Sequence, residues 1–234
     1  MSTIRQDTWF AMYPYAGGGV GAYAPLVPYL DGRHLHVPVL PGRDGRRDET
    51  ALTEFGDLAD DLFAQLEPEL AARRAESLVL FGYSLGGMLA FEMARRIESA
   101  GTTPRALVVG GSAAPDRWKP RGIAHLDEET FVSRLRTLGI APAELLDEPW
   151  VRQACMPAWR ADSRVAESVP RRTATLRCPV HALAGHRDPL AGPADLASWE
   201  HTGGPGSSSG LVAGDHGTLV RNPVVLARTL RKAA

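Results

Sequence analysis

The sequence lacks several features that would tie it to an oxidising compartment, a membrane or a nucleic acid. Its 234 residues include only two cysteines, too few for a disulfide framework. The formal net charge is −1, with acidic and basic residues interspersed, so no basic surface points to nucleic acid or to an anionic membrane. No apolar run is long enough to span a bilayer, and the N-terminal residues lack the basic-then-apolar order of a signal peptide. We therefore expect a cytoplasmic protein.

The apolar residues, by contrast, are plentiful and regularly placed. Hydrophobic residues make up 44% of the chain, enough for the core of one domain spanning residues 1–234. Short strand-like apolar runs lie at residues 8–13, 34–39, 78–81, 106–110, 179–184 and 210–213. Helical patterns lie between several of them, at residues 52–70, 85–97 and 223–232. This alternation predicts an α/β fold with a mostly parallel central sheet flanked by helices.

One region interrupts the alternation of strands and helices. From about residue 112 to about residue 177 there is no convincing strand, and apolar stripes at residues 127–138 and 148–161 predict helices instead. A helical insertion between two strands would form a lid over the carboxyl ends of the sheet. Each apolar residue taken alone fits ordinary helix packing equally well. The segment GGPGSSSG, residues 203–210, is typical of a surface loop.

The sequence GYSLG places Ser84 in a narrow turn between a strand and a helix. The pattern G-x-S-x-G is common by chance, but in this setting it is typical of a serine nucleophile held above a sheet. Gly82 and Gly86 would let the strand and the helix approach closely. The Leu85 N–H, at the helix start, would face the same space and form half of an oxyanion hole. A glycine-rich turn that binds phosphate is the alternative.

A serine nucleophile needs a base and an acid that orients the base. His216 follows the last strand and precedes the C-terminal helix, the place of the base when the chain order is serine, acid, histidine. Asp188, in GHRDP, follows the preceding strand and could accept the Nδ1–H of His216. Asp215 is the rival acid, but as the immediate neighbour of His216 it is poorly placed. The remaining histidines lie in strands, helices or loops without catalytic companions.

The second oxyanion donor is expected in the loop after an early strand, here YPYAGGGVGAY. Gly17 and the two glycines after it would allow backbone N–H groups to face a ligand. A nucleotide-phosphate loop is the competing interpretation, but the segment contains neither G-K-[ST] nor G-x-G-x-x-G. We therefore assign the second oxyanion N–H to Ala16, with Gly17 as the alternative.

Taken together, the motifs of the chain resemble one known family. In order, they are PYAGG (residues 14–18), LPGRDGR (40–46), FGYSLGG (81–87), GHRDP (185–189) and GDHGTL (214–219), with LGIAPAELLDEP (138–149) and MPAWRADS (156–163) between them. The chain resembles a stand-alone type II thioesterase of polyketide and nonribosomal peptide assembly lines. The similarity extends over nearly the whole chain, and the joint order and spacing make it much more specific than the serine motif alone.

The resemblance implies an α/β-hydrolase fold with a helical lid and a hydrolase of acyl thioesters. The substrate would be an acyl group on the phosphopantetheine thiol of an acyl or peptidyl carrier protein, and the enzyme would clear stalled or wrongly loaded units. It would be a monomer without metal or cofactor. By position, Ser84 is the nucleophile, His216 the base and Asp188 the orienting acid. Ala16 and Leu85 would stabilise the oxyanion.

The acyl group needs a pocket. Departures of this chain from the family pattern leave the enzyme's choice of substrate open. Tyr15, Tyr83 and Gly17 lie beside the expected site, and lid residues Trp150, Met156 and Trp159 would shape the acyl chamber. Family members often have histidine where this chain has Tyr15 and Tyr83. They usually place bulky aromatic residues after the catalytic histidine, whereas this chain has Gly217 and Thr218.

Two questions of function stay open at this level. The same triad would serve an acyl-CoA thioesterase, an esterase, or an acyltransferase or cyclase; a non-catalytic scaffold has no need of an intact triad. Carrier proteins are usually acidic, so basic residues could receive them, although solvated arginines are the commoner case. The candidates are Arg43, Arg46, Arg47, Arg95, Arg96 and Lys119.

Overall fold

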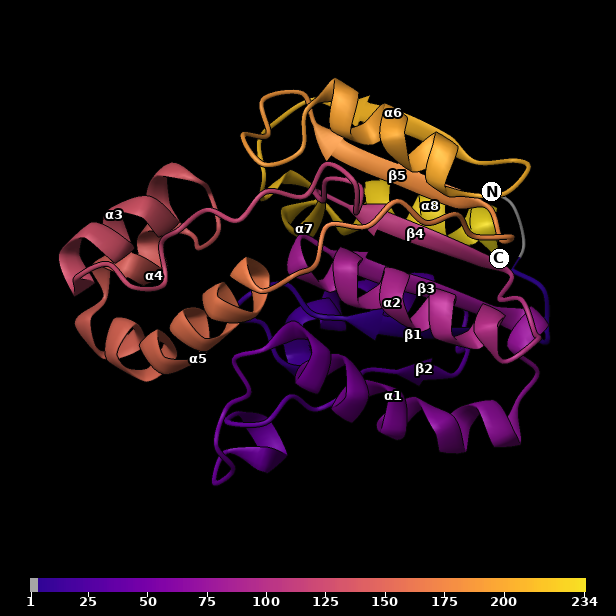
Figure 1. Ribbon diagram of the computed structural model, residues 1–234, viewed down its shortest axis with the longest axis horizontal. Helices are drawn as coiled ribbons and strands as arrows, with labels where there is room; N and C mark the ends of the chain where they lie inside the picture. The colour runs from indigo at the N-terminus through magenta and orange to yellow at the C-terminus, as the bar shows by residue number, and fades with distance from the viewer. Residues whose placement is uncertain (1–3) are drawn as a thin grey trace.

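Residues 4–234 are described by a computed structural model in which six parallel strands form one sheet in the order β2-β1-β3-β4-β5-β6 (Figure 1). The strands are β1 (Trp9–Tyr13), β2 (Leu35–His36), β3 (Leu78–Tyr83), β4 (Ala106–Gly110), β5 (Val180–Gly185) and β6 (Ser208–Val212). The α-helices are α1 (Phe55–Ala72), α2 (Leu85–Ser99), α3 (Glu128–Thr137), α4 (Ala143–Asp147), α5 (Pro149–Glu167), α6 (Pro193–Thr202), α7 (Thr218–Arg221) and α8 (Pro223–Ala233). The predicted fold class is confirmed.

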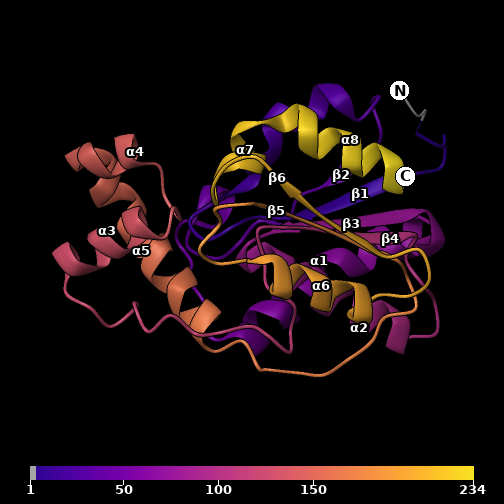
Figure 2. The same cartoon turned by 90° about the horizontal axis from the view of Figure 1, so that it is seen from above.

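The buried strands send successive side chains to opposite faces of the sheet, because the period of a strand is two residues. Trp9, Ala11 and Tyr13 of β1 pack with α1, α2 and α6. Phe10 and Met12 pack on the other face with α8 and the 3-10 helix η1 (Val20–Tyr29). Figure 2, seen from above, shows α8 on one side of the sheet and α1, α2 and α6 on the other. The continuous apolar runs of the sequence therefore become a core with two faces.

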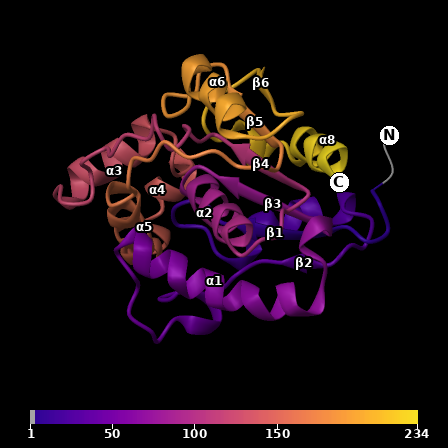
Figure 3. The ribbon, with the colours of Figure 1, turned by 45° about the vertical axis from the view of Figure 1, so that its right-hand side comes forward.

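The segment between β4 and β5, residues 111–179, contains α3, α4 and α5 and no strand. We call it the lid; in Figure 1 its helices lie beyond one end of the sheet. It has a small core of its own, formed by Ile123, Phe131, Val132, Leu135, Ala141, Leu146 and Trp159. Figure 3 shows α5 next to α1, where the Ser168 hydroxyl accepts a hydrogen bond from the Phe55 N–H (2.7 Å). The helical segment predicted between these strands is confirmed.

Two edge elements differ from the sequence prediction for identifiable reasons. The run predicted as a strand at residues 34–39 keeps only Leu35–His36, since Pro38 has no N–H for the sheet. At the opposite edge, β6 begins at Ser208, inside the segment predicted as a surface loop. Its serines bond to polar side chains of neighbouring elements: the Ser208 hydroxyl lies 2.9 Å from the His181 Nδ1 of β5, and the Ser209 hydroxyl donates to Glu200 of α6. A polar edge strand carries no apolar signal in its sequence.

The predicted triad and oxyanion residues all lie at one edge of the sheet, at the carboxyl ends of the parallel strands, whereas the predicted Trp150, Met156 and Trp159 lie on α5. The loops after β1, β3, β5 and β6 lie at the carboxyl ends of parallel strands, and register pairs such as Tyr13 with Gly82 and Tyr83 with Gly110 bring these ends level. The lid also leaves the sheet at this edge, after Gly110. Among residues 4–234, no helix is long and apolar enough to cross a membrane.

Candidate active site

The turn that carries Ser84 is strained, and two glycines permit it. Ser84 has φ 53° and ψ −120°, between β3 and α2, a region that residues with a Cβ rarely occupy. A Cβ on Gly82 would lie 1.9 Å from the carbonyl oxygen of Gly86, and one on Gly86 would lie 2.0 Å from that of Tyr13. The strand and the helix can therefore cross this closely only with glycine at both positions.

Asp188 and His216 form a buried pair 28 residues apart in sequence. The His216 Nδ1 lies 2.9 Å and 3.0 Å from the two Asp188 carboxylate oxygens, and the side chains are 4% and 0% exposed. Because an ionised carboxylate only accepts, Nδ1 carries the proton and Nε2 is left to act as a base. One Asp188 oxygen also accepts the Leu190 N–H (2.8 Å), which orients the carboxylate.

The rival acid, Asp215, has a different role in the structure. Its carboxylate accepts the Gly217 N–H (3.0 Å) and a hydrogen bond from the Arg221 guanidinium. The interaction with Arg221 contributes to a lowered pKa of Asp215, against the opposing effect of partial burial. Its side chain is about half exposed. Asp215 thus shapes the loop that carries His216, while Asp188 contacts the imidazole.

Tyr83, directly before the nucleophile, supports the same loop. Its hydroxyl donates to the backbone carbonyl of His216, and its ring lies 5.4 Å from the imidazole ring between centroids. Burial, with a smaller contribution from the Asp188 charge, raises the pKa of Tyr83 far above its ordinary value. The hydroxyl therefore stays protonated and remains a donor. The sequence predicted Tyr83 only as a substrate contact.

The expected oxyanion donors face a common space with the nucleophile. Ala16, Ser84 and Leu85 line one apolar hollow together. Leu85 is the first residue of α2, so its N–H has no acceptor within the helix. The alternative donor, Gly17, is not available, because its N–H donates to the Asp162 carboxylate (2.6 Å). Within residues 4–234 the Ser84 hydroxyl has no hydrogen-bond partner, so the structure does not join it to His216, although both residues line one hollow.

Two hollows meet at Ser84, and Ala16 and Ile140 belong to both. The first is apolar and has a volume of about 610 Å³ including its open mouth. It is lined by Leu85, Ala113, Trp118, Ile123, Ser163, Ala166 and Leu190, with Lys119, Arg121 and Glu167 also on its wall. The second is more polar, about 1040 Å³ with its open mouth, and lies between the lid and the His216 loop. Tyr15, Tyr83, Arg136, Pro142, Glu144 and Arg221 are among the residues that line it.

Of the three lid residues expected at the acyl chamber, none lines either hollow. Trp150 is 71% exposed on α5. Met156 packs on the lid core and borders a separate surface hollow. Trp159 is buried against Gly17, where an added Cβ would come within 2.1 Å of the indole. The apolar stripe of α5 therefore forms the lid core and touches the loop that carries Ala16 and Gly17. Apolar periodicity shows that a helix face is buried but not which residues cover it.

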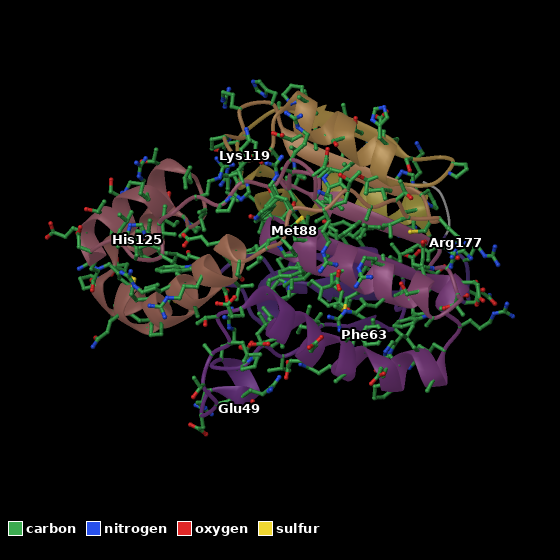
Figure 4. All side chains as sticks on the ribbon, in the orientation of Figure 1. Glu49, Phe63, Met88, Lys119, His125 and Arg177 are labelled. Carbon is green, nitrogen blue, oxygen red and sulfur yellow. The ribbon has the colours of Figure 1, made fainter. Side chains whose placement is uncertain are left out.

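Residues that the sequence did not single out form much of the cavity wall. Trp118 lies in a segment without periodicity, and no pattern marked it. Ile140 lies within LGIAPAELLDEP, where the family resemblance was the one signal. Asp162 lies within MPAWRADS, one of the segments that carried the family resemblance, so that similarity was the one available signal. Figure 4 places Lys119 at the junction of lid and sheet, and His125 within the lid, away from the strands.

Most of the arginines expected at a docking surface have intramolecular partners instead. Arg43 is paired with Asp162, Arg46 with Glu49 and Asp61, and both Arg95 and Arg96 with Glu92. Arg47 and Lys119 are exposed. A basic residue is not recognisable from sequence as free or paired, because its partner can lie one turn away on the same helix, as Glu92 does for Arg95, or on a distant element, as Asp162 does for Arg43.

Comparison with known proteins identifies the family of the chain. Residues 10–234 match the family described as thioesterase domain. The thioesterase PikA5 of Streptomyces venezuelae is 37% identical over 199 residues, covering 82% of this chain and 69% of that protein. The structure of the type II thioesterase BorB from the borrelidin biosynthetic cluster has a TM-score of 0.83 and 30% identity, covering 100% of this chain and 93% of that one.

A second solved structure agrees with the first. The RedJ thioesterase of the prodiginine pathway in Streptomyces coelicolor has a TM-score of 0.85 and 27% identity, over 97% of this chain and 86% of that one. The two solved structures match 100% and 97% of this chain. The resemblance to type II thioesterases is thereby confirmed, and the chain belongs to the thioesterase family of α/β-hydrolases, enzymes that hydrolyse thioester bonds.

Proposed function

We propose that this enzyme releases acyl groups from the phosphopantetheine thiol of acyl or peptidyl carrier proteins and so clears stalled or wrongly loaded units. The observation that carries the proposal is the meeting of two unlike hollows at Ser84. A thioester on a long, polar arm needs an open, polar approach on one side of the carbonyl and an apolar space on the other. The acyl chain fits the apolar hollow beside Leu85, and the arm fits the open hollow beside Tyr15 and Tyr83.

The proposed chemistry follows from the geometry of the triad. Ser84 Oγ attacks the thioester carbonyl while His216 Nε2 takes its proton, and Asp188 stabilises the imidazolium. The Ala16 and Leu85 N–H groups hold the oxyanion, each contributing about 3 kcal/mol by analogy with other oxyanion holes. The carbon–sulfur bond then breaks as His216 protonates the thiolate. Water, activated by His216, attacks the Ser84 ester and releases the free acid and the serine.

The decisive experiment is the intact mass of an acylated carrier protein after incubation with the enzyme or with Ser84→Ala. We expect the enzyme to remove the acyl mass and leave the phosphopantetheine, and the variant to leave the carrier unchanged. The same acyl group offered on CoA and on an oxygen ester tests the alternative substrates. Higher kcat/KM on CoA than on the carrier would overturn the choice of substrate. Failure of the protein to react with a fluorophosphonate would overturn serine catalysis itself.

The proposal places the enzyme in the cytoplasm, where free thiols remain reduced. Cys155 and Cys178 are both free thiols. Burial, with the Glu98 charge adding to it, raises the pKa of the Cys178 thiol to about 12. That thiol therefore stays protonated and unreactive. Ser84 is the nucleophile at the meeting point of the two hollows.

A further inference from the structure

A buried ion pair joins the lid to the loops of the sheet beside the active site. Arg43 lies in the loop after β2, and Asp162 lies on α5, 119 residues later. The two guanidinium nitrogens lie 2.8 Å and 2.6 Å from the two carboxylate oxygens, and the side chains are 10% and 2% exposed. Such a bidentate pair fixes both the distance and the orientation of its members.

The pair also holds the loop that carries the second oxyanion donor. The Asp162 carboxylate accepts the Gly17 N–H (2.6 Å), and Arg43 donates to the Gly18 carbonyl (2.8 Å). The Gly18 N–H donates to the Tyr15 carbonyl (2.8 Å), which closes a tight turn with Ala16 and Gly17 at its centre. Gly17 has φ +80°, the value typical of the second central residue of a type II turn.

The central peptide of such a turn can rotate, and Asp162 opposes the rotation. A turned peptide would direct the Ala16 carbonyl, in place of the Gly17 N–H, at a buried carboxylate, which would repel it. The indole of Trp159, one turn before Asp162 on α5, packs on Gly17 from the same side. Rotation of this peptide changes the ψ torsion of Ala16 and the φ torsion of Gly17. Residues of the lid therefore restrain both torsions, and with them the backbone next to the Ala16 N–H.

We infer that the Arg43–Asp162 pair is a positioning device that aligns the Ala16 N–H for the oxyanion and does so only when α5 is seated on the sheet. Ser163, the residue after Asp162, lines the apolar hollow with Ala16 and Ser84. One helix, α5, thus contacts both the wall of the apolar hollow and the loop that carries Ala16. This inference rests on the proposed roles of Ser84 and Ala16 but not on the identity of the substrate carrier.

An alternative role, stability alone, predicts different behaviour. Removing one member of a buried ion pair leaves an unpaired charge and destabilises a protein, whereas replacing both with apolar residues is often neutral or stabilising. The double variant Arg43→Met/Asp162→Leu therefore separates the two roles. It removes the unpaired charge but cannot hold the Gly17 N–H or the Gly18 carbonyl.

The test compares Asp162→Asn and this double variant with the wild type, using a p-nitrophenyl acyl ester and a trifluoromethyl ketone that forms a tetrahedral adduct with serine. We expect kcat to fall about tenfold to a hundredfold in both, because small misplacement of catalytic groups has effects of this size. KM should stay within about twofold, and affinity for the ketone should fall in proportion to kcat. The double variant should have a Tm at or above that of Asp162→Asn and yet remain slow.

The matched control is Asp61→Asn. Asp61 accepts two hydrogen bonds from the Arg46 guanidinium (2.7 Å and 2.9 Å). Arg46 is only three residues from Arg43, but its pair with Asp61 joins the loop to α1 and borders neither hollow. Its kcat should stay at the wild-type level. The inference would be overturned if the double variant regained kcat as well as Tm. It would also be overturned if Asp61→Asn lost as much kcat as Asp162→Asn. A wild type that hydrolyses the ester but not a carrier thioester would refute only the proposed substrate.

Discussion

The sheet and the lid are stabilised in different ways, and the difference explains how they divide the work of catalysis. The strands bury side chains on both faces, and Phe10, Leu80 and Val108 are 0% exposed. The lid has a small core of its own, and it is joined to the sheet by directional hydrogen bonds together with a few apolar residues such as Val165 and Val169, which lie in the main core. Examples of these hydrogen bonds are the Phe55 N–H donating to the Ser168 hydroxyl (2.7 Å) and the Gly17 N–H donating to the Asp162 carboxylate (2.6 Å).

The residues proposed to carry out the chemistry and the residues that shape the apolar hollow therefore lie in different parts of the chain. Ser84, Asp188 and His216 all lie on loops at the sheet edge, where close packing resists displacement. The walls of the apolar hollow come largely from the lid, whose attachments can be changed singly. Substitutions at the sheet edge should therefore abolish chemistry or folding, and substitutions in the lid should alter rate and selectivity.

The largest expected contrast is between two serines on the same hollow, Ser84 on the sheet edge and Ser163 on the lid. Ser84→Ala should lower kcat at least about 10⁴-fold, because no other group can form the acyl intermediate. Ser163→Ala should change kcat by less than about threefold, since a cavity-wall hydroxyl takes no part in bond making. Steady-state hydrolysis of a thioester by the two purified variants measures both effects.

A second contrast compares glycines in the two regions. Gly82→Ala should destabilise the protein by about 3 kcal/mol or more, since the new Cβ meets a backbone carbonyl oxygen. In the lid, the Cβ added by Gly122→Ala would meet no atom within 4 Å. Only the φ of +63° at this position disfavours alanine, which should lower stability by about 1 kcal/mol. Urea unfolding followed by circular dichroism gives both values. Equal losses would show that the lid is packed as tightly as the sheet.

A smaller effect is expected at the hydroxyl that supports the His216 loop. Tyr83→Phe removes the donor to the His216 carbonyl and should lower kcat about tenfold, with a stability loss of about 1 kcal/mol. Tyr23→Phe is the control, because the Tyr23 hydroxyl lies in the same buried cluster but donates to the Tyr13 carbonyl (2.8 Å) and not to the His216 loop. It should cost similar stability and leave kcat unchanged. A normal kcat in Tyr83→Phe would remove this residue from the catalytic support.

The smallest effect concerns the choice of acyl chain. Trp118→Ala should enlarge the apolar hollow and shift the ratio of kcat/KM values toward longer chains by about fivefold, the scale of one or two methylene groups. Trp150→Ala, which changes an exposed lid residue, should leave the ratio unchanged. A series of thioesters of increasing chain length measures both. An unchanged profile in Trp118→Ala would place the end of the acyl chain elsewhere.

Much of the fold and the chemical centre could be predicted because the signals are local. Strand runs such as residues 106–110 are apolar throughout, and the glycines around Ser84 mark a turn that few other residues permit. Edge elements were less predictable, as the polar strand at Ser208 shows. The pocket was the least predictable part: α5 is amphipathic as expected, but Trp150 faces solvent and Trp159 packs on Gly17 rather than on a substrate.

The sequence by itself determined the alternation of strands and helices, the strained serine turn and the order of Ser84, Asp188 and His216, because each depends on neighbouring residues or on the order of loops at one sheet edge. Only the tertiary structure decided that Gly17 donates to Asp162 and that Arg43 pairs with the same carboxylate. Both contacts join residues that are more than a hundred positions apart in the sequence. Long-range packing supplies that information, and no local pattern contains it.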